Sequence, residues 1–133
     1  MPGRADEALA ALAARVRTDT ALVAALGGPR VYRAGEKRAP EVPSVEYRVV
    51  FGRLDEAFEP VLTQWDVFAW DQDTMQTVVE RLRRLLHWVG WRTINGVALN
   101  SRYEEMRDHD SQESGIIHRS IDFRHEPVRR RGW

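Results

Sequence analysis

Hydrophobic residues recur at helical spacing near the start of the chain. Residues 5–17 place alanine, leucine and valine on one side of a helix. A second, shorter helix is predicted from Ala21 to Leu26, with Thr18 or Asp19 able to cap its first turn. Gly27-Gly28-Pro29 should end it, because glycine accepts the left-handed conformation and proline cannot continue a helix. The chain is therefore expected to open with two short helices.

The clearest helical pattern covers residues 74–89, whose hydrophobic positions follow the 3.6-residue period. Asp73 is expected as the N-cap of this helix. Gly90 is expected to end it, bringing Trp91 against Leu86. Its opposite side carries mainly arginine and glutamate, which is typical of a solvated or interface surface.

Alternating patterns predict strands on either side of that helix. Residues 44–51 alternate between hydrophobic and polar positions. Residues 61–70 are hydrophobic on both sides, with Leu62, Phe68 and Trp70 opposite the side that carries Trp65. A strand of this kind needs a cover on each face, and a neighbouring subunit is the expected second cover.

Two further strands, 97–107 and 116–124, are predicted after a two-residue hairpin turn at Asn95-Gly96. The predicted order is α-α-β-β-α-β-β. The expected fold class is α+β, a four-stranded, mainly antiparallel sheet with helices packed mainly on one face.

Length and composition narrow the class of protein. With 133 residues the chain suits one domain, predicted over residues 1–126, followed by a basic arm over 127–133. It has no cysteine, which excludes disulfides and thiolate metal sites. Equal numbers of basic and acidic residues argue against a general DNA-binding protein. Neither a signal peptide nor a membrane-spanning segment is predicted.

Candidate chemistry is sparse. Asp108-His109-Asp110 could hold a metal or form an acid/base pair, but a polar hairpin tip is the favoured interpretation. His118 and His125 should face opposite sides of a strand and are expected as surface or interface residues. Asp66 flanks aromatic residues without a partner that the sequence identifies. No phosphate-binding loop or nucleophile motif occurs, so no catalytic, cofactor-binding or metal-binding residue is predicted.

The basic arm carries Arg129, Arg130, Arg131 and the terminal Trp133. It could contact DNA phosphates, act as a solubilising tail, or grip an adjacent subunit. Trp133 favours the last, because a tryptophan at a free end has little use unless it docks. The predicted subunit-interface residues are Leu62, Phe68, Trp70, Arg129, Arg130, Arg131 and Trp133.

The stretch from Ala21 to Val50 resembles the opening of the small tail-completion proteins of long-tailed phages and gene transfer agents. The matching features are a short helix ending in Gly27-Gly28, the pair Val31-Tyr32, a loop with Pro40 and Pro43, and the alternating strand at 45–51. The pattern of the continuation, through VFAW at 67–70 and the long helix, extends the resemblance over residues 8–126. The basic arm with Trp133 is not recognised as part of the pattern.

The resemblance implies a tail terminator, a non-enzymatic virion protein that forms a ring, commonly hexameric, on the last ring of the tail tube. Its implied partners are its own copies, the tail tube protein, a neck or head-completion protein, and DNA passing through the channel without sequence-specific binding. The implied location is the head-proximal end of the tail, assembled in the host bacterial cytoplasm. The alternatives are a head-completion or neck protein, a small metal-dependent hydrolase using Asp108, His109 and Asp110, and a dimeric ligand-binding or antitoxin-like module.

Overall fold

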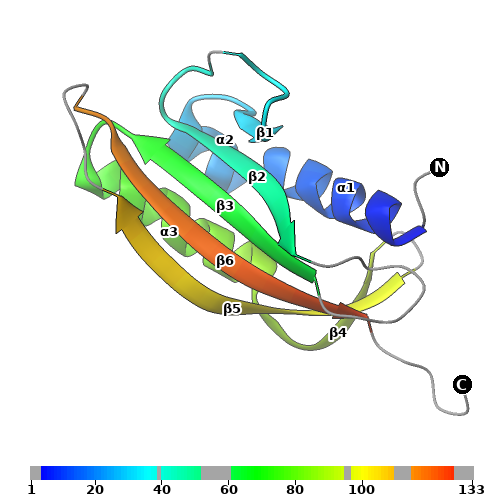
Figure 1. The fold of residues 1–133 in the computed structure, drawn as a ribbon. Helices are drawn as coiled ribbons and strands as arrows, with labels where there is room; N and C mark the ends of the chain where they lie inside the picture. The colour runs from blue at the N-terminus through cyan, green and yellow to red at the C-terminus, as the bar shows by residue number, and fades with distance from the viewer. Residues whose placement is uncertain (1–3, 39, 52–60, 95–96, 110–114, 128–133) are drawn as a thin grey trace, which may run out of the picture.

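The computed structural model describes residues 4–38, 40–51, 61–94, 97–109 and 115–127 (Figure 1). These residues form three helices and six strands. In chain order they are α1 Arg4–Arg17, α2 Thr20–Leu26, β1 Val31–Arg33, β2 Ser44–Phe51, β3 Val61–Ala69, α3 Gln72–Leu86, β4 Trp88–Ile94, β5 Val97–His109 and β6 Ile117–Pro127. No helix among the described residues is long and hydrophobic enough to cross a bilayer.

The prediction of a four-stranded sheet is wrong. The strands form one six-stranded mixed sheet in the order β1-β2-β3-β6-β5-β4. β1 runs parallel to β2, and the other neighbouring strands are antiparallel. The sheet is strongly curved, with β5 and β6 bending along its length (Figure 1). Two strands at opposite edges, β1 and β4, are the ones missing from the predicted order.

β4 was not predicted because the helical spacing of hydrophobic residues continues into its first residues. The long helix starts at Gln72, with Asp71 rather than Asp73 as N-cap, and ends at Leu86. His87 is its extended C-cap, so Gly90 does not end a helix but lies within β4. The helix stops here because Trp88 is buried as the first residue of β4, where its indole N–H donates to the carbonyl of Leu99 (3.0 Å). The burial of Trp88, and not the helical spacing of the hydrophobic residues, therefore determines where the helix ends.

The first two helices agree more closely with the elements that the sequence predicts. The helix over 5–17 is confirmed within α1, and the corner before α2 is capped by Asp19, whose carboxylate accepts from the N–H of Leu22. Gly27 ends α2 in the left-handed conformation, with φ of 79°. Asp19 also holds Arg81 of α3 through two hydrogen bonds of 2.7 Å, which ties α2 to α3.

All three helices lie on one side of the sheet (Figure 1). We call this side the covered face and the other the open face. The core fills the space between the covered face and the helices, with Trp65 and Phe123 from the sheet, Leu22 from α2, and Leu82 and Leu86 from α3. Alternate residues of each strand therefore face two different environments.

Candidate functional site

Polar side chains of three neighbouring strands meet on the open face. The register aligns Phe68 of β3 with His118 of β6, and His118 with His109 of β5. One step along the strands on the same face, Asp66 is aligned with Ser120. Since residues two apart on a strand share a face, these five side chains form one cluster.

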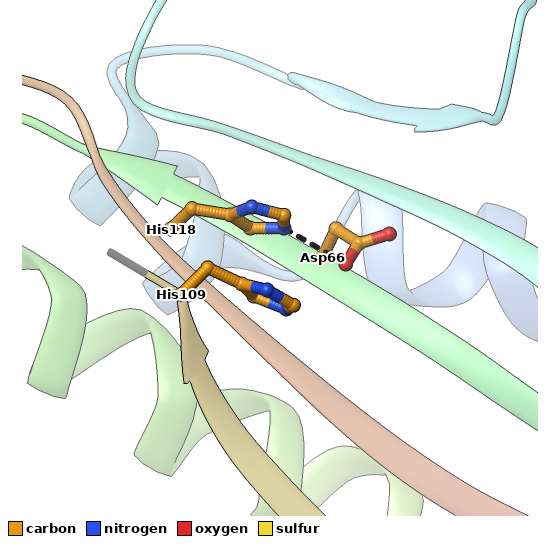
Figure 2. Close-up of side chains that lie close together, drawn as sticks. All are labelled: Asp66, His109 and His118. Carbon is orange, nitrogen blue, oxygen red and sulfur yellow. Dashed lines mark hydrogen bonds and ion pairs between the residues drawn. The ribbon is translucent and has the colours of Figure 1, made fainter. Parts of the chain in front are cut away.

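Asp66, His109 and His118 are the centre of this cluster (Figure 2). Each can offer one ligand atom, and the three atoms lie within 4.8 Å of one another. His118 Nε2 is 3.0 Å from Asp66 Oδ1, and His109 Nε2 is 2.7 Å from the hydroxyl of Ser120. The Ser120 hydroxyl in turn donates to Asp66 Oδ1.

Aromatic stacking aligns the two imidazole rings. The His109 and His118 ring centres are 4.1 Å apart with an interplanar angle of 18°, so the rings are nearly parallel (Figure 2). The Phe68 ring stacks on the other side of His118 at 4.4 Å. His118 is therefore held between two rings, with its Nε2 edge directed at Asp66.

Asp66 is buried, with 2% of its surface exposed, although it faces away from the helices. Burial is the largest single influence and raises the pKa of this carboxyl group. Hydrogen bonds from Ser120, His118 and Gln64 together outweigh burial and leave the pKa of Asp66 below its ordinary value. Arg48 lies 3.6 Å from its second oxygen and also favours the carboxylate. Asp66 is thus an anion at neutral pH.

The rest of the open face carries paired charges. Arg107 of β5 forms two hydrogen bonds with the buried carboxylate of Asp122, at 2.7 and 3.1 Å. These bonds raise the pKa of Arg107 above its ordinary value. Further along, Arg102 and Arg124 both contact Glu126. The face is strongly polar, and its arginines are matched by carboxylates.

The covered face holds a histidine of a different kind. His125 is fully buried, with Nε2 at 2.7 Å from the Thr63 hydroxyl and Nδ1 at 3.1 Å from the Ser101 hydroxyl. Trp65 donates its indole N–H to Thr63, and Ser101 donates its hydroxyl hydrogen to the carbonyl of Leu86. Thr63 is then free to donate to Nε2, and Ser101 to accept from Nδ1–H. These hydrogen bonds place a proton on Nδ1, and they suit a neutral ring whose Nε2 accepts from Thr63.

Burial lowers the pKa of His125 to about 4, consistent with that neutral state. The expectation that His125 is a surface or interface residue is therefore wrong. The expectation that His118 and His125 face opposite sides is confirmed, since His118 belongs to the open-face cluster.

The structure brings together only part of the group Asp108-His109-Asp110, which the sequence offered as a candidate but favoured as a polar hairpin tip. His109 joins the open-face cluster, whereas Asp108 forms an ion pair with Arg119 outside it. Asp110 lies outside the described residues. The sequence did not identify His118 and Ser120 as partners of Asp66, because they follow it by 52 and 54 residues and the register of their strand was unknown.

The predicted interface residues on β3 face the open side. Leu62 and Phe68 are half-buried. Trp70, directly after the strand, is 56% exposed, and its indole N–H donates to the carbonyl of Val42 at 3.2 Å. Arg129, Arg130, Arg131 and Trp133 lie outside the described residues.

A comparison with solved structures finds a similar chain in one described as the "Virion of native gene transfer agent (GTA) particle". The TM-score is 0.66 at 16% sequence identity, and the match covers 89% of this chain and 92% of that chain. At this identity the likeness demonstrates a shared fold. No protein-family model matches the chain, and no curated protein matches it in sequence.

Proposed function

We propose that the chain is a structural protein of a phage-type or gene transfer agent particle, and that it acts there as the tail terminator. The observation that carries this proposal is the shared fold with a chain of a gene transfer agent virion, over nearly the full length of both chains. The sequence pattern of residues 8–126 supports the same class of particle independently, through its resemblance to tail-completion proteins.

In this role, copies of the chain form a ring, hexameric by the family resemblance, on the last ring of the tail tube. A closed ring of identical subunits needs two different, complementary surfaces on each subunit. Three features of the described part of the chain could supply them: the short parallel strand β1 at one edge of the sheet, the antiparallel strand β4 at the other, and the exposed Trp70.

The proposed interface residues are Leu62 and Phe68 on β3 and Trp70 directly after it, and the proposed arm contacts are Arg129, Arg130, Arg131 and Trp133. Trp70 is the strongest of these, because a large exposed aromatic side chain gains most from burial in a subunit contact. The other partners proposed are the tail tube protein and a neck or head-completion protein. DNA would pass through the ring without sequence-specific binding, and the role requires no catalysis.

Electron microscopy of particles assembled without this chain tests the proposal. A tail terminator stops tube growth, so its loss should produce tail tubes of uncontrolled length that are not joined to heads. Tails of normal length joined to heads would contradict any essential role in tail completion. Free tails of normal length beside unjoined heads would instead support the head-completion alternative. Adding back the purified protein during assembly is the control that ties the defect to this chain.

A further inference from the structure

We propose that Asp66, His109 and His118 form a binding site for a divalent transition-metal ion of the Zn²⁺ class. The site lies on the open face, where three adjacent strands each contribute one ligand. This inference does not rest on the ring role, since it concerns a cluster within one subunit.

The donor set suits such an ion. Two imidazole nitrogens and one carboxylate oxygen are ligands that Zn²⁺, Co²⁺ and Ni²⁺ accept, whereas Mg²⁺ and Ca²⁺ prefer oxygen ligands throughout. His118 is 29% exposed and His109 is exposed, so an ion can reach the cluster from solvent. Water molecules would complete the coordination on the solvent side.

Most of the site is already held in position. Phe68 stacks on His118, and Gln64 donates to both carboxylate oxygens of Asp66, at 3.0 and 3.1 Å. Arg48 lies nearer to Oδ2 of that carboxylate, which leaves Oδ1, the oxygen now facing His118 and Ser120, to bind the ion. Supporting contacts of this kind orient metal ligands and are a regular part of metal sites.

Binding requires a local rearrangement of both rings. The ion replaces the contact of His118 Nε2 with Asp66 Oδ1 and that of His109 Nε2 with the Ser120 hydroxyl, so each neutral ring carries its proton on Nδ1. The two imidazole rings are nearly parallel at present and must tilt toward each other, because a metal binds close to the plane of each ring. His109 and His118 are directly paired on neighbouring strands, so both side chains lie within reach of one ion.

Titration of Zn²⁺ into the chain, purified without a polyhistidine tag and followed by calorimetry, tests the site. We expect saturable binding of one ion per chain. His109→Gln should weaken binding at least tenfold, and this variant should still fold, because His109 is exposed. Asp108→Asn is the matched control: it removes a neighbouring carboxylate that pairs with Arg119 outside the cluster, and should change affinity less than twofold.

Co²⁺ provides a second readout, since coordination by imidazole changes its visible absorption spectrum and the change should be lost in His109→Gln. The proposal is overturned if Zn²⁺ shows no saturable binding. It is also overturned if His109→Gln binds as tightly as the unaltered chain, or if Asp108→Asn loses binding to the same extent as His109→Gln.

Discussion

His118 and His125 lie on the same strand, β6, yet their surroundings differ in nearly every respect. His118 faces the open side, half-buried between two rings and next to the carboxylate of Asp66. His125 faces the helices, fully buried, with neutral hydroxyl groups at both ring nitrogens. The positions are seven residues apart, an odd number, and this parity alone assigns them to opposite faces.

The difference explains what each face contributes. On the covered face a polar group is tolerated only because each of its hydrogen-bonding atoms has a partner, so His125 is part of the core. On the open face polar groups are concentrated around the buried carboxylate of Asp66, and solvent reaches the histidines beside it. The covered face therefore maintains the fold, whereas the open face carries the proposed metal site.

The largest effect that separates the faces is expected from removing each ring. His125→Ala should lower the free energy of unfolding by about 3–5 kcal/mol, because it leaves a cavity and two buried hydroxyl groups with lost partners. His118→Ala removes a partly exposed ring and one contact to Asp66, and should cost about 1 kcal/mol. Urea unfolding of both variants measures the difference. Equal losses would contradict the division into two faces.

The second effect is a dependence of stability on pH. His125 has a folded pKa of about 4, below its ordinary value of 6.5, so the unfolded chain binds the proton more readily. The contribution of neutral His125 to the free energy of unfolding is fully present above pH 6.5. It is lost as the pH drops toward 4, by about 3 kcal/mol in total. The lowered pKa of Asp66 acts below its ordinary value of 3.8, so its contribution is lost at more acidic pH.

The pH effect is measured by urea unfolding between pH 7 and 4. His125→Gln cannot titrate and should lose most of the slope in this range, whatever its overall stability. A slope that persists unchanged in His125→Gln would show that another group causes it.

A smaller effect is expected among the charges of the open face. Arg107→Gln removes the guanidinium that forms two hydrogen bonds with the buried carboxylate of Asp122. It should lower the free energy of unfolding by about 1 kcal/mol, since the exposure of Arg107 reduces the loss. Arg102→Gln is the matched control on the same strand: its partner Glu126 is partly exposed, and the change should stay below about 0.5 kcal/mol. Thermal unfolding at two salt concentrations compares the variants, and a larger cost for Arg102→Gln would refute this ranking.

The smallest effect on the fold is expected at Trp70. Trp70→Ala should change the free energy of unfolding of the isolated chain by less than about 1 kcal/mol, because more than half of the side chain is exposed. If Trp70 is a subunit contact as proposed, the same variant should fail to cap tail tubes in an assembly reaction. Val49→Ala is a suitable control, since Val49 is also an exposed hydrophobic residue on the sheet and is not a proposed contact. If Trp70→Ala caps tail tubes normally, Trp70 is not a subunit contact.

The sequence predicted those elements whose local pattern agrees with their environment. Asp19 and Gly27 bound α2 as expected, and the alternation of residues 44–51 matches β2. β4 could not be predicted, because Leu85, Leu86 and Val89 continue a helical period that the burial of Trp88 interrupts. β1 has only three residues, too few to produce a pattern.

The open-face cluster could not be predicted from the sequence, for a different reason. The odd separation of His118 and His125 along the strand shows that they face opposite sides of the sheet. It does not show which residues of the neighbouring strands lie beside each of them. Asp66 meets His118 across 52 positions of sequence, through the register of β3 with β6. A register of this kind depends on the packing of the whole sheet, so the histidines could be recognised as candidates while their partner could not.

Reconstruction of the native particle by electron microscopy tests the proposed function most directly. We predict that this fold occupies a single ring at the head-proximal end of the tail tube, with Trp70 at a contact between subunits. Finding the chain along the length of the tube, within the head, or absent from the particle would contradict it.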